Sequence, residues 1–202
     1  MGAWQELSTL VKGRLEAASS SERSVFAAGV AERLMSRREA LPEDEQAPFT
    51  TGLRPLLNSV REGALGDSTA FAAVNRGVAE YMLSDYCHND GQDGPDDADE
   101  AAAAAVLFAA HAYLFGCADF AVWASSRAVD AVDQHREYLT EQEEQDPPDP
   151  DEALIAELRR QLHDLDLIAA RAAELRHAKF GLPIDASIRL RVELRAPLSG
   201  RE

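Results

Sequence analysis

The stretch Ala98–Phe115, ADEAAAAAVLFAAHAYLF, decides the fold class of this chain. After its first three residues it holds only small or apolar side chains, apart from His111 and Tyr113. A helix that is apolar on every side is typical of the centre of a protein. Its alanines would also let neighbouring helices approach closely. The stretch therefore predicts a helical domain built around this segment.

Six other segments have apolar residues at intervals of three and four, which places these residues on one face of a helix. Turn and cap residues separate the segments. Ser19–Ser21 supplies a cap for one helix, and Asp149-Pro150-Asp151-Glu152 is a strong start for another. The sequence predicts an all-α fold of about seven helices in one bundle-like domain, residues 1–183. The expected helices are Ala3–Ala17, Glu22–Ala40, Thr51–Ala64, Ser68–Tyr86, Ala98–Phe115, Asp119–Thr140 and Pro150–Lys179.

The tail, residues 184–202, has a different pattern. From Ile184 to Ala196 every even position is apolar and every odd position is polar or charged. A period of two is typical of a strand with one buried face, and Pro197 would end it. We therefore expect a single C-terminal β-strand over Ala186–Arg195.

A lone strand leaves a row of unpaired backbone groups, so it favours a partner from outside its own chain. Antiparallel pairing with a second copy keeps the even residues on one face and sets Glu193 opposite an arginine. Pairing with another protein, packing on its own bundle as an extended segment, and a disordered tail are the alternatives. The expected interaction residues are Ile188, Leu190, Arg191, Val192, Glu193 and Leu194.

The chain is strongly acidic, with 36 Asp and Glu against 20 Lys and Arg and a net charge of −16. This charge argues against nucleic acids and anionic lipids as partners and permits a basic protein. The longest apolar run, Ala101–Ala110, is too short to span a membrane. The opening residues, MGAWQELSTL, lack the features of a signal peptide. We therefore expect a cytoplasmic protein with no membrane or nucleic-acid partner.

The densest cluster of reactive side chains lies where a helix is expected to end. Two cysteines in a chain with no visible export signal are expected to be reduced, and neither belongs to a Cys-x-x-Cys motif. A second Cys/His group at zinc spacing is also missing from the sequence. We interpret the cluster as a surface turn around a buried cysteine. It consists of Asp85, Tyr86, Cys87, His88 and Asp90.

Other polar residues on the expected helices have ordinary structural explanations. Glu174 and His177 form one Glu-x-x-His motif, whereas di-iron sites need two. His111 is interpreted as a core histidine, with a ligand role as the alternative. Asp119 is interpreted as a helix N-cap, with an ion pair to Arg127 as the alternative. The sequence has no phosphate loop, nucleophile elbow or H-E-x-x-H motif, so we assign no catalytic, cofactor or metal residues.

One segment supports a family resemblance. Arg23–Arg38, RSVFAAGVAERLMSRR, follows an amphipathic helix with a Trp-Gln pair and places Phe26, Glu32, Arg33 and Leu34 in an F-x5-E-R-hydrophobic pattern. With the alanine-rich fifth helix, the acidic linker containing prolines, the long last helix and the apolar tail, it resembles the YjaG-like bacterial proteins over nearly the whole chain. The resemblance implies an all-helical fold. Because the function of that family is uncharacterised, it implies no activity.

These observations favour a non-enzymatic cytoplasmic protein that acts through protein–protein contacts and self-associates through its tail. One alternative is an acidic inhibitor of the immunity or antitoxin type, which covers a basic protein and binds less tightly as salt rises. The other is a metal- or small-ligand-binding enzyme. It would use His111, Asp119, or Glu174 with His177 in a closed pocket.

Overall fold

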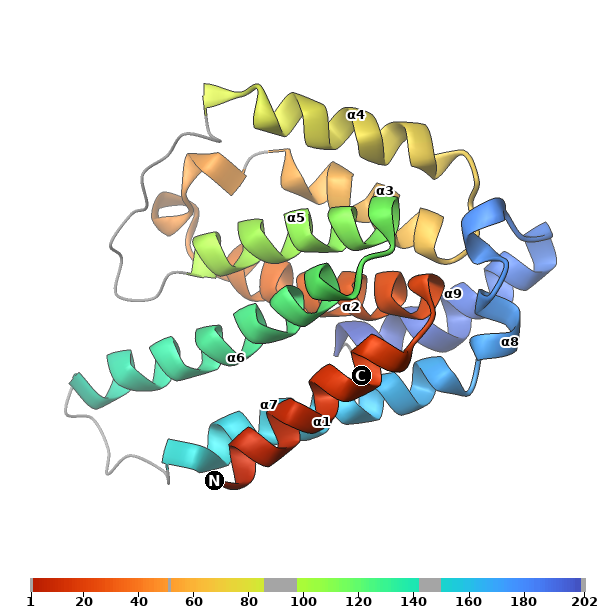
Figure 1. Ribbon diagram of the computed structural model, residues 1–202. Coiled ribbons are helices and arrows are strands. Elements are labelled where there is room, and N and C mark those ends of the chain that lie inside the picture. Colours follow the sequence, from red (N-terminus) through yellow and green to blue (C-terminus); the bar gives the residue numbers. More distant parts are fainter. Residues whose placement is uncertain (1, 51, 86–97, 142–149, 201–202) are drawn as a thin grey trace.

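The computed structural model describes residues 2–50, 52–85, 98–141 and 150–200 (Figure 1). Within these ranges the chain forms nine α-helices, three short 3₁₀-helices and no β-strand. The all-α class is confirmed, whereas the expectations of seven helices and of a C-terminal strand are wrong. The elements are α1 (Ala3–Ala17), α2 (Ser20–Glu39), η1 (Glu43–Glu45), η2 (Pro48–Thr50), α3 (Leu53–Ala64), α4 (Ala70–Met82), α5 (Ala98–Phe115), α6 (Ala118–Glu141), α7 (Pro150–Ala169), α8 (Ala172–Leu175), η4 (Ala178–Phe180) and α9 (Ile184–Ser199).

Helices α2 and α5 form the centre of the bundle, with α3 and α4 on one side and α1 and α7 on the other (Figure 1). Small side chains allow the two central helices to approach closely. The Ser24 hydroxyl on α2 donates to the Ser20 carbonyl of its own helix at 2.8 Å and has the Ala112 carbonyl on α5 as a second, longer acceptor at 3.3 Å. The central position expected for Ala98–Phe115 is confirmed, and α2 shares it. Their buried small residues include Ala27, Ala28, Gly29 and Ala31 on α2 and Ala102, Ala105, Ala109 and Ala112 on α5.

Among the described helices, α5 is the one whose length and composition would suffice to cross a membrane, with a mean hydropathy of 1.2 over 18 residues. Within the bundle, 61% of this segment is buried. The core helix of a soluble protein has the same properties, so a single helix of this kind is weak evidence for a membrane span.

The start of α2 follows the sequence closely. Ser19 accepts a hydrogen bond from the Glu22 backbone N–H at 3.3 Å, and Glu22 Oε2 accepts one from the Ser19 backbone N–H at 2.9 Å. This reciprocal pair is a capping box, which satisfies two backbone donors at the helix start. The cap expected from the serine run is confirmed.

The long helix expected over Pro150–Lys179 is interrupted at Ala169. The chain bends there and continues as α8 and η4, which pack on α2 and α3. Leu175 and Ala178 become 0% and 1% exposed in these turns. The free energy gained by burying these apolar side chains against the bundle therefore outweighs the free energy of continuing the helix.

Helix α9 stands where a strand was expected. Its inner row of side chains, Ser187, Leu190, Leu194 and Leu198, is buried and has helical spacing. A second apolar row, Ile184, Ile188 and Val192, also repeats every four residues but is exposed. Two rows of period four, offset by two positions, together produce an alternation of period two. The alternation was therefore misinterpreted as a strand.

We expect Ala109→Leu to lower the free energy of unfolding by on the order of 1–3 kcal/mol, because Ala109 is fully buried in α5 and a larger side chain would overpack the core. Ala104→Leu, at a half-buried position of the same helix, should have a smaller effect. Denaturant unfolding of both variants measures the difference. Equal losses would contradict tight packing around Ala109.

Candidate functional site

Helix α9 is held firmly on the bundle. It contacts α2 and α7. Near its start, the Ser187 hydroxyl donates to the Leu65 carbonyl at 2.8 Å. In its last turn, Arg33 Nη1 donates to the Leu198 carbonyl at 2.9 Å. Leu198 also lies on Gly29 of α2, where an added Cβ would come within 3.1 Å of the Leu198 Cβ.

The opposite side of α9 carries an exposed apolar strip, which we call the outer row. Ile184, Ile188 and Val192 are 77%, 51% and 73% exposed. Single exposed apolar residues are ordinary on protein surfaces. Three of them at intervals of four on one helix form a continuous patch, which is typical of a contact surface.

The structure does not bring the six expected interaction residues to one contact surface. Leu190 and Leu194 are 0% and 2% exposed and serve the core. Ile188 and Val192 belong to the outer row. The expectation that all four apolar residues share one face is therefore wrong, because successive even positions on a helix are about 200° apart rather than aligned.

The two charged members of the predicted set form ion pairs within the chain. Arg191 Nη2 lies 2.5 Å from Glu62 Oε2, and Glu193 Oε2 lies 2.8 Å from Arg171 Nε. Arg195, which follows Arg191 by one turn, is 3.8 Å from the other oxygen of Glu62. Glu193 thus finds its arginine in its own chain and not across a strand pair.

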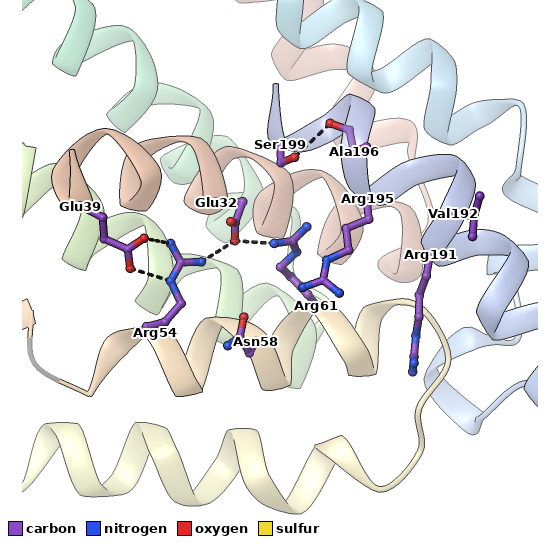
Figure 2. Close-up of a pocket in the computed structure, with 10 residues that line it drawn as sticks. All are labelled: Glu32, Glu39, Arg54, Asn58, Arg61, Arg191, Val192, Arg195, Ala196 and Ser199. Atoms are coloured by element: carbon purple, nitrogen blue, oxygen red, sulfur yellow. Dashed lines mark hydrogen bonds and ion pairs between the residues drawn. The ribbon is translucent and has the colours of Figure 1, made fainter. Parts of the chain in front are cut away.

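An open cleft of about 610 Å³ lies between α3 and α9, with α2 as its floor (Figure 2). Four arginines line it, two from α3 and two from α9, against two glutamates from α2. We call it the arginine cleft. Its lining residues are Glu32, Glu39, Arg54, Asn58, Arg61, Arg191, Val192, Arg195, Ala196 and Ser199.

Glu32 forms the floor of the cleft and is only 2% exposed. Its Oε2 accepts from Arg54 Nη1 at 2.7 Å and pairs with Arg61 Nη1 at 2.5 Å (Figure 2). Arg54 also donates two hydrogen bonds to Glu39, from Nε to Oε1 at 2.7 Å and from Nη2 to Oε2 at 2.6 Å. Arg54 therefore has three strong hydrogen bonds to carboxylates, which fix its position.

The two α3 arginines have opposite electrostatic surroundings. Burial works to lower the pKa of Arg54, but hydrogen bonds and charge from Glu39 and Glu32 outweigh it, and the pKa is raised. Burial lowers the pKa of Arg61, and the nearby charges of Arg195 and Arg54 lower it further against the opposing effect of Glu32. The lowered pKa of Arg61 is thus mainly an effect of its burial.

The α9 arginines are held less completely than Arg54. Within the described ranges, Arg195 makes one ion pair, at 3.8 Å to Glu62, which is beyond hydrogen-bond distance. The Nε of Arg191 is buried and has no hydrogen-bond partner in the described part of the chain. Figure 2 shows the Arg195 guanidinium extending from α9 toward that of Arg61.

Of the four cleft arginines, Arg191 alone belongs to the interaction residues predicted from the sequence. A signal was present, because Arg54 and Arg61 are seven residues apart and Arg191 and Arg195 are four apart, both spacings of one helical face. In the predicted strand, Arg191 and Arg195 are odd members of a period-two alternation, so their shared helical face was not recognised. That the two pairs face each other across Glu32 is a property of the tertiary packing.

His111 on α5 is half-buried, not enclosed in the core, and has an aromatic environment. The His111 ring lies 5.7 Å from that of Phe115 and 5.0 Å from that of Phe120, between ring centroids. Burial lowers the pKa of His111. Among the described residues, no three His, Cys, Asp or Glu side chains gather as metal ligands.

The remaining polar residues singled out from the sequence form contacts within the chain or lie outside the described residues. Glu174 accepts from Arg189 Nη2 at 2.9 Å. Asp119 lies in the first turn of α6, which begins at Ala118. It is therefore inside the helix, and the expected N-cap role is wrong. Arg127 pairs with Asp130 at 3.5 Å. In the cluster expected to be a surface turn, four residues lie outside the described residues: Tyr86, Cys87, His88 and Asp90.

The comparisons with known proteins give no match: no family model, no curated protein and no solved structure is significantly similar to this chain. The resemblance to the YjaG-like proteins therefore stays a prediction. The function has to be inferred from the surface of α9 and from the arginine cleft.

We expect Glu32→Gln to destabilise the fold by on the order of 3–5 kcal/mol, because it leaves the buried Arg61 charge without its carboxylate. Glu39→Gln is the matched control. The Glu39 side chain is 36% exposed, and loss of a surface pair should cost about 1 kcal/mol or less. Chemical denaturation of the two variants compares them, and similar losses would show that Glu32 does not anchor the cleft.

Proposed function

We propose that the protein is a non-enzymatic binding protein that acts through protein–protein contacts at the outer row of α9, and that its partner is a second copy of the chain. The observation that carries this proposal is the exposure of Ile184, Ile188 and Val192 on a helix otherwise fixed to the core. Burying each side chain would contribute up to about 1.5–3 kcal/mol before the entropy of association is subtracted.

The charges beside the outer row support a second copy as the partner. Helical spacing places Asp185 and Arg189 on the same side of the row. In an antiparallel two-fold pairing of α9 centred on Ile188, each Asp185 faces Arg189 of the partner subunit, which pairs with Glu174 of its own chain and would gain a second carboxylate there. The other side carries Arg191 and Arg195, whose charges Glu62 already offsets within the chain.

The same charges are the reason for preferring self-association to the inhibitor alternative. An immunity-type inhibitor would cover a basic protein with an acidic surface. The apolar row of α9 is flanked by Arg189, Arg191 and Arg195, whose charges Glu174 and Glu62 offset, so this face does not offer the acidic surface that a basic partner needs. The residues named for the enzyme alternative are His111, Asp119, and Glu174 with His177, and no three metal-ligating side chains gather among the described residues.

We expect the wild-type protein to have twice the 22.0 kDa mass of the chain in light scattering at tens of micromolar, roughly where interfaces of ordinary size are populated. Ile188→Glu should give the mass of a single chain, because it places a like-charged pair at the two-fold axis. Asp185→Arg should weaken the dimer, because it would face Arg189 of the partner subunit.

The matched control is Leu83→Glu, which makes the same kind of change at an 88% exposed residue beyond α4 and should leave the mass unchanged. A wild-type protein of single-chain mass at this concentration would reject self-association. A dimer that survives Ile188→Glu would reject the outer row of α9 as its interface.

A further inference from the structure

We propose that the arginine cleft binds a small organic molecule that carries a phosphate or carboxylate group, and that Arg61 and Arg195 hold this group between them. The site adjoins the outer row of α9, with which it shares Val192, but the argument for it rests on the arginines of the cleft. Three observations support it: the local charge, the unused hydrogen-bond donors and the size of the cleft.

The cleft has a surplus of positive charge. Four arginines line it, against Glu32 and Glu39, and Glu62 pairs with Arg191 and Arg195 from outside the lining. Counting all three carboxylates still leaves one cation in excess, in a chain whose net charge is −16. A cleft with surplus positive charge attracts anions and concentrates them.

The surplus is located at Arg195, because each of the other three arginines has a carboxylate oxygen within 2.7 Å. Arg54 has both of its carboxylates at hydrogen-bond distance. Arg61 is paired to Glu32 through Nη1 at 2.5 Å, and Arg195 lies near enough to lower the pKa of Arg61 by charge repulsion. An anion between the two guanidinium groups would replace this repulsion with two attractions.

The donors of these arginines fit an oxyanion. A guanidinium presents its N–H groups in a rigid fork that binds carboxylate and phosphate oxygens in pairs. In the described part of the chain, Arg195 makes no hydrogen bond and has one long contact, at 3.8 Å to Glu62. The buried Nε of Arg191 is a further donor without a partner among the described residues.

The size and walls of the cleft indicate an organic ligand and not a bare ion. Its volume of about 610 Å³ is typical of pockets for small organic molecules and much larger than one phosphate needs. Val192 and Ala196 form an apolar wall, and the amide of Asn58 adds a neutral polar group. The ligand therefore combines an oxyanion with an uncharged body.

Isothermal titration with three related probes tests the site: phenyl phosphate, benzoate and uncharged phenol. We expect phenyl phosphate, benzoate or both to bind the full chain with a Kd of about 1 mM or tighter at low salt, and phenol not to bind. Stronger binding of phenyl phosphate would assign a phosphate ligand, and stronger binding of benzoate a carboxylate ligand.

Arg195→Gln should weaken binding at least tenfold, about 1.4 kcal/mol, because it removes the guanidinium with the most unused donors. Arg195→Lys keeps the charge but loses the fork, so it should restore binding in part. Arg14→Gln is the matched control, because it removes the same charge from α1, away from the cleft and from α9, where Arg14 pairs with Asp166.

The site is rejected if neither anion binds at on the order of 10 mM. It is also rejected if Arg195→Gln binds as the wild type does, or if Arg14→Gln loses as much affinity as Arg195→Gln, which would indicate general attraction to basic side chains. Melting temperatures without ligand show that each variant is folded. Ile188→Glu should still bind the probe, so this test is independent of self-association.

Discussion

The close approach of α2 to α5 is the constraint on which the rest of the bundle depends. Small side chains make both helices narrow at the contact, and the bond from Ser24 to the Ala112 carbonyl crosses it. Helices α3, α6, α7 and α9 cover other sides of α2. Two adjacent charged residues in the middle of α2, Glu32 and Arg33, are therefore enclosed and need partners within the protein.

These two charges determine which elements meet at α2. Glu32 is paired with two arginines of α3, whereas Arg33 binds Asp164 of α7 at 2.6 Å and the Leu198 carbonyl of α9 at 2.9 Å. Burial raises the pKa of Asp164 although Arg33 opposes the shift. Buried ion pairs add little net stability but are costly to break, and we infer that they select this arrangement of helices. The arginine cleft results from both sets of contacts.

Local patterns predicted most of the helices, because their apolar spacing and caps lie within a few residues of each other, as the capping box at Ser19 shows. The tail was misassigned because two helical rows add up to an alternation, and only packing on α2 shows which row is inside. The break at Ala169 depends on burial of Leu175, which is a tertiary effect. The cleft was missed because its charged residues come from three helices far apart in sequence.

The two apolar rows of α9 have a consequence for the behaviour of the chain when this helix detaches. In an extended conformation Ile188, Leu190, Val192 and Leu194 would all lie on one face, which is the sequence signature of aggregation-prone strands. The odd positions then carry Arg189, Arg191 and Arg195, whose charges oppose the formation of a sheet between molecules. Pro197 ends the row of backbone hydrogen-bond donors that such a sheet needs. The arginines that border the cleft in the native state would thus keep the released tail soluble.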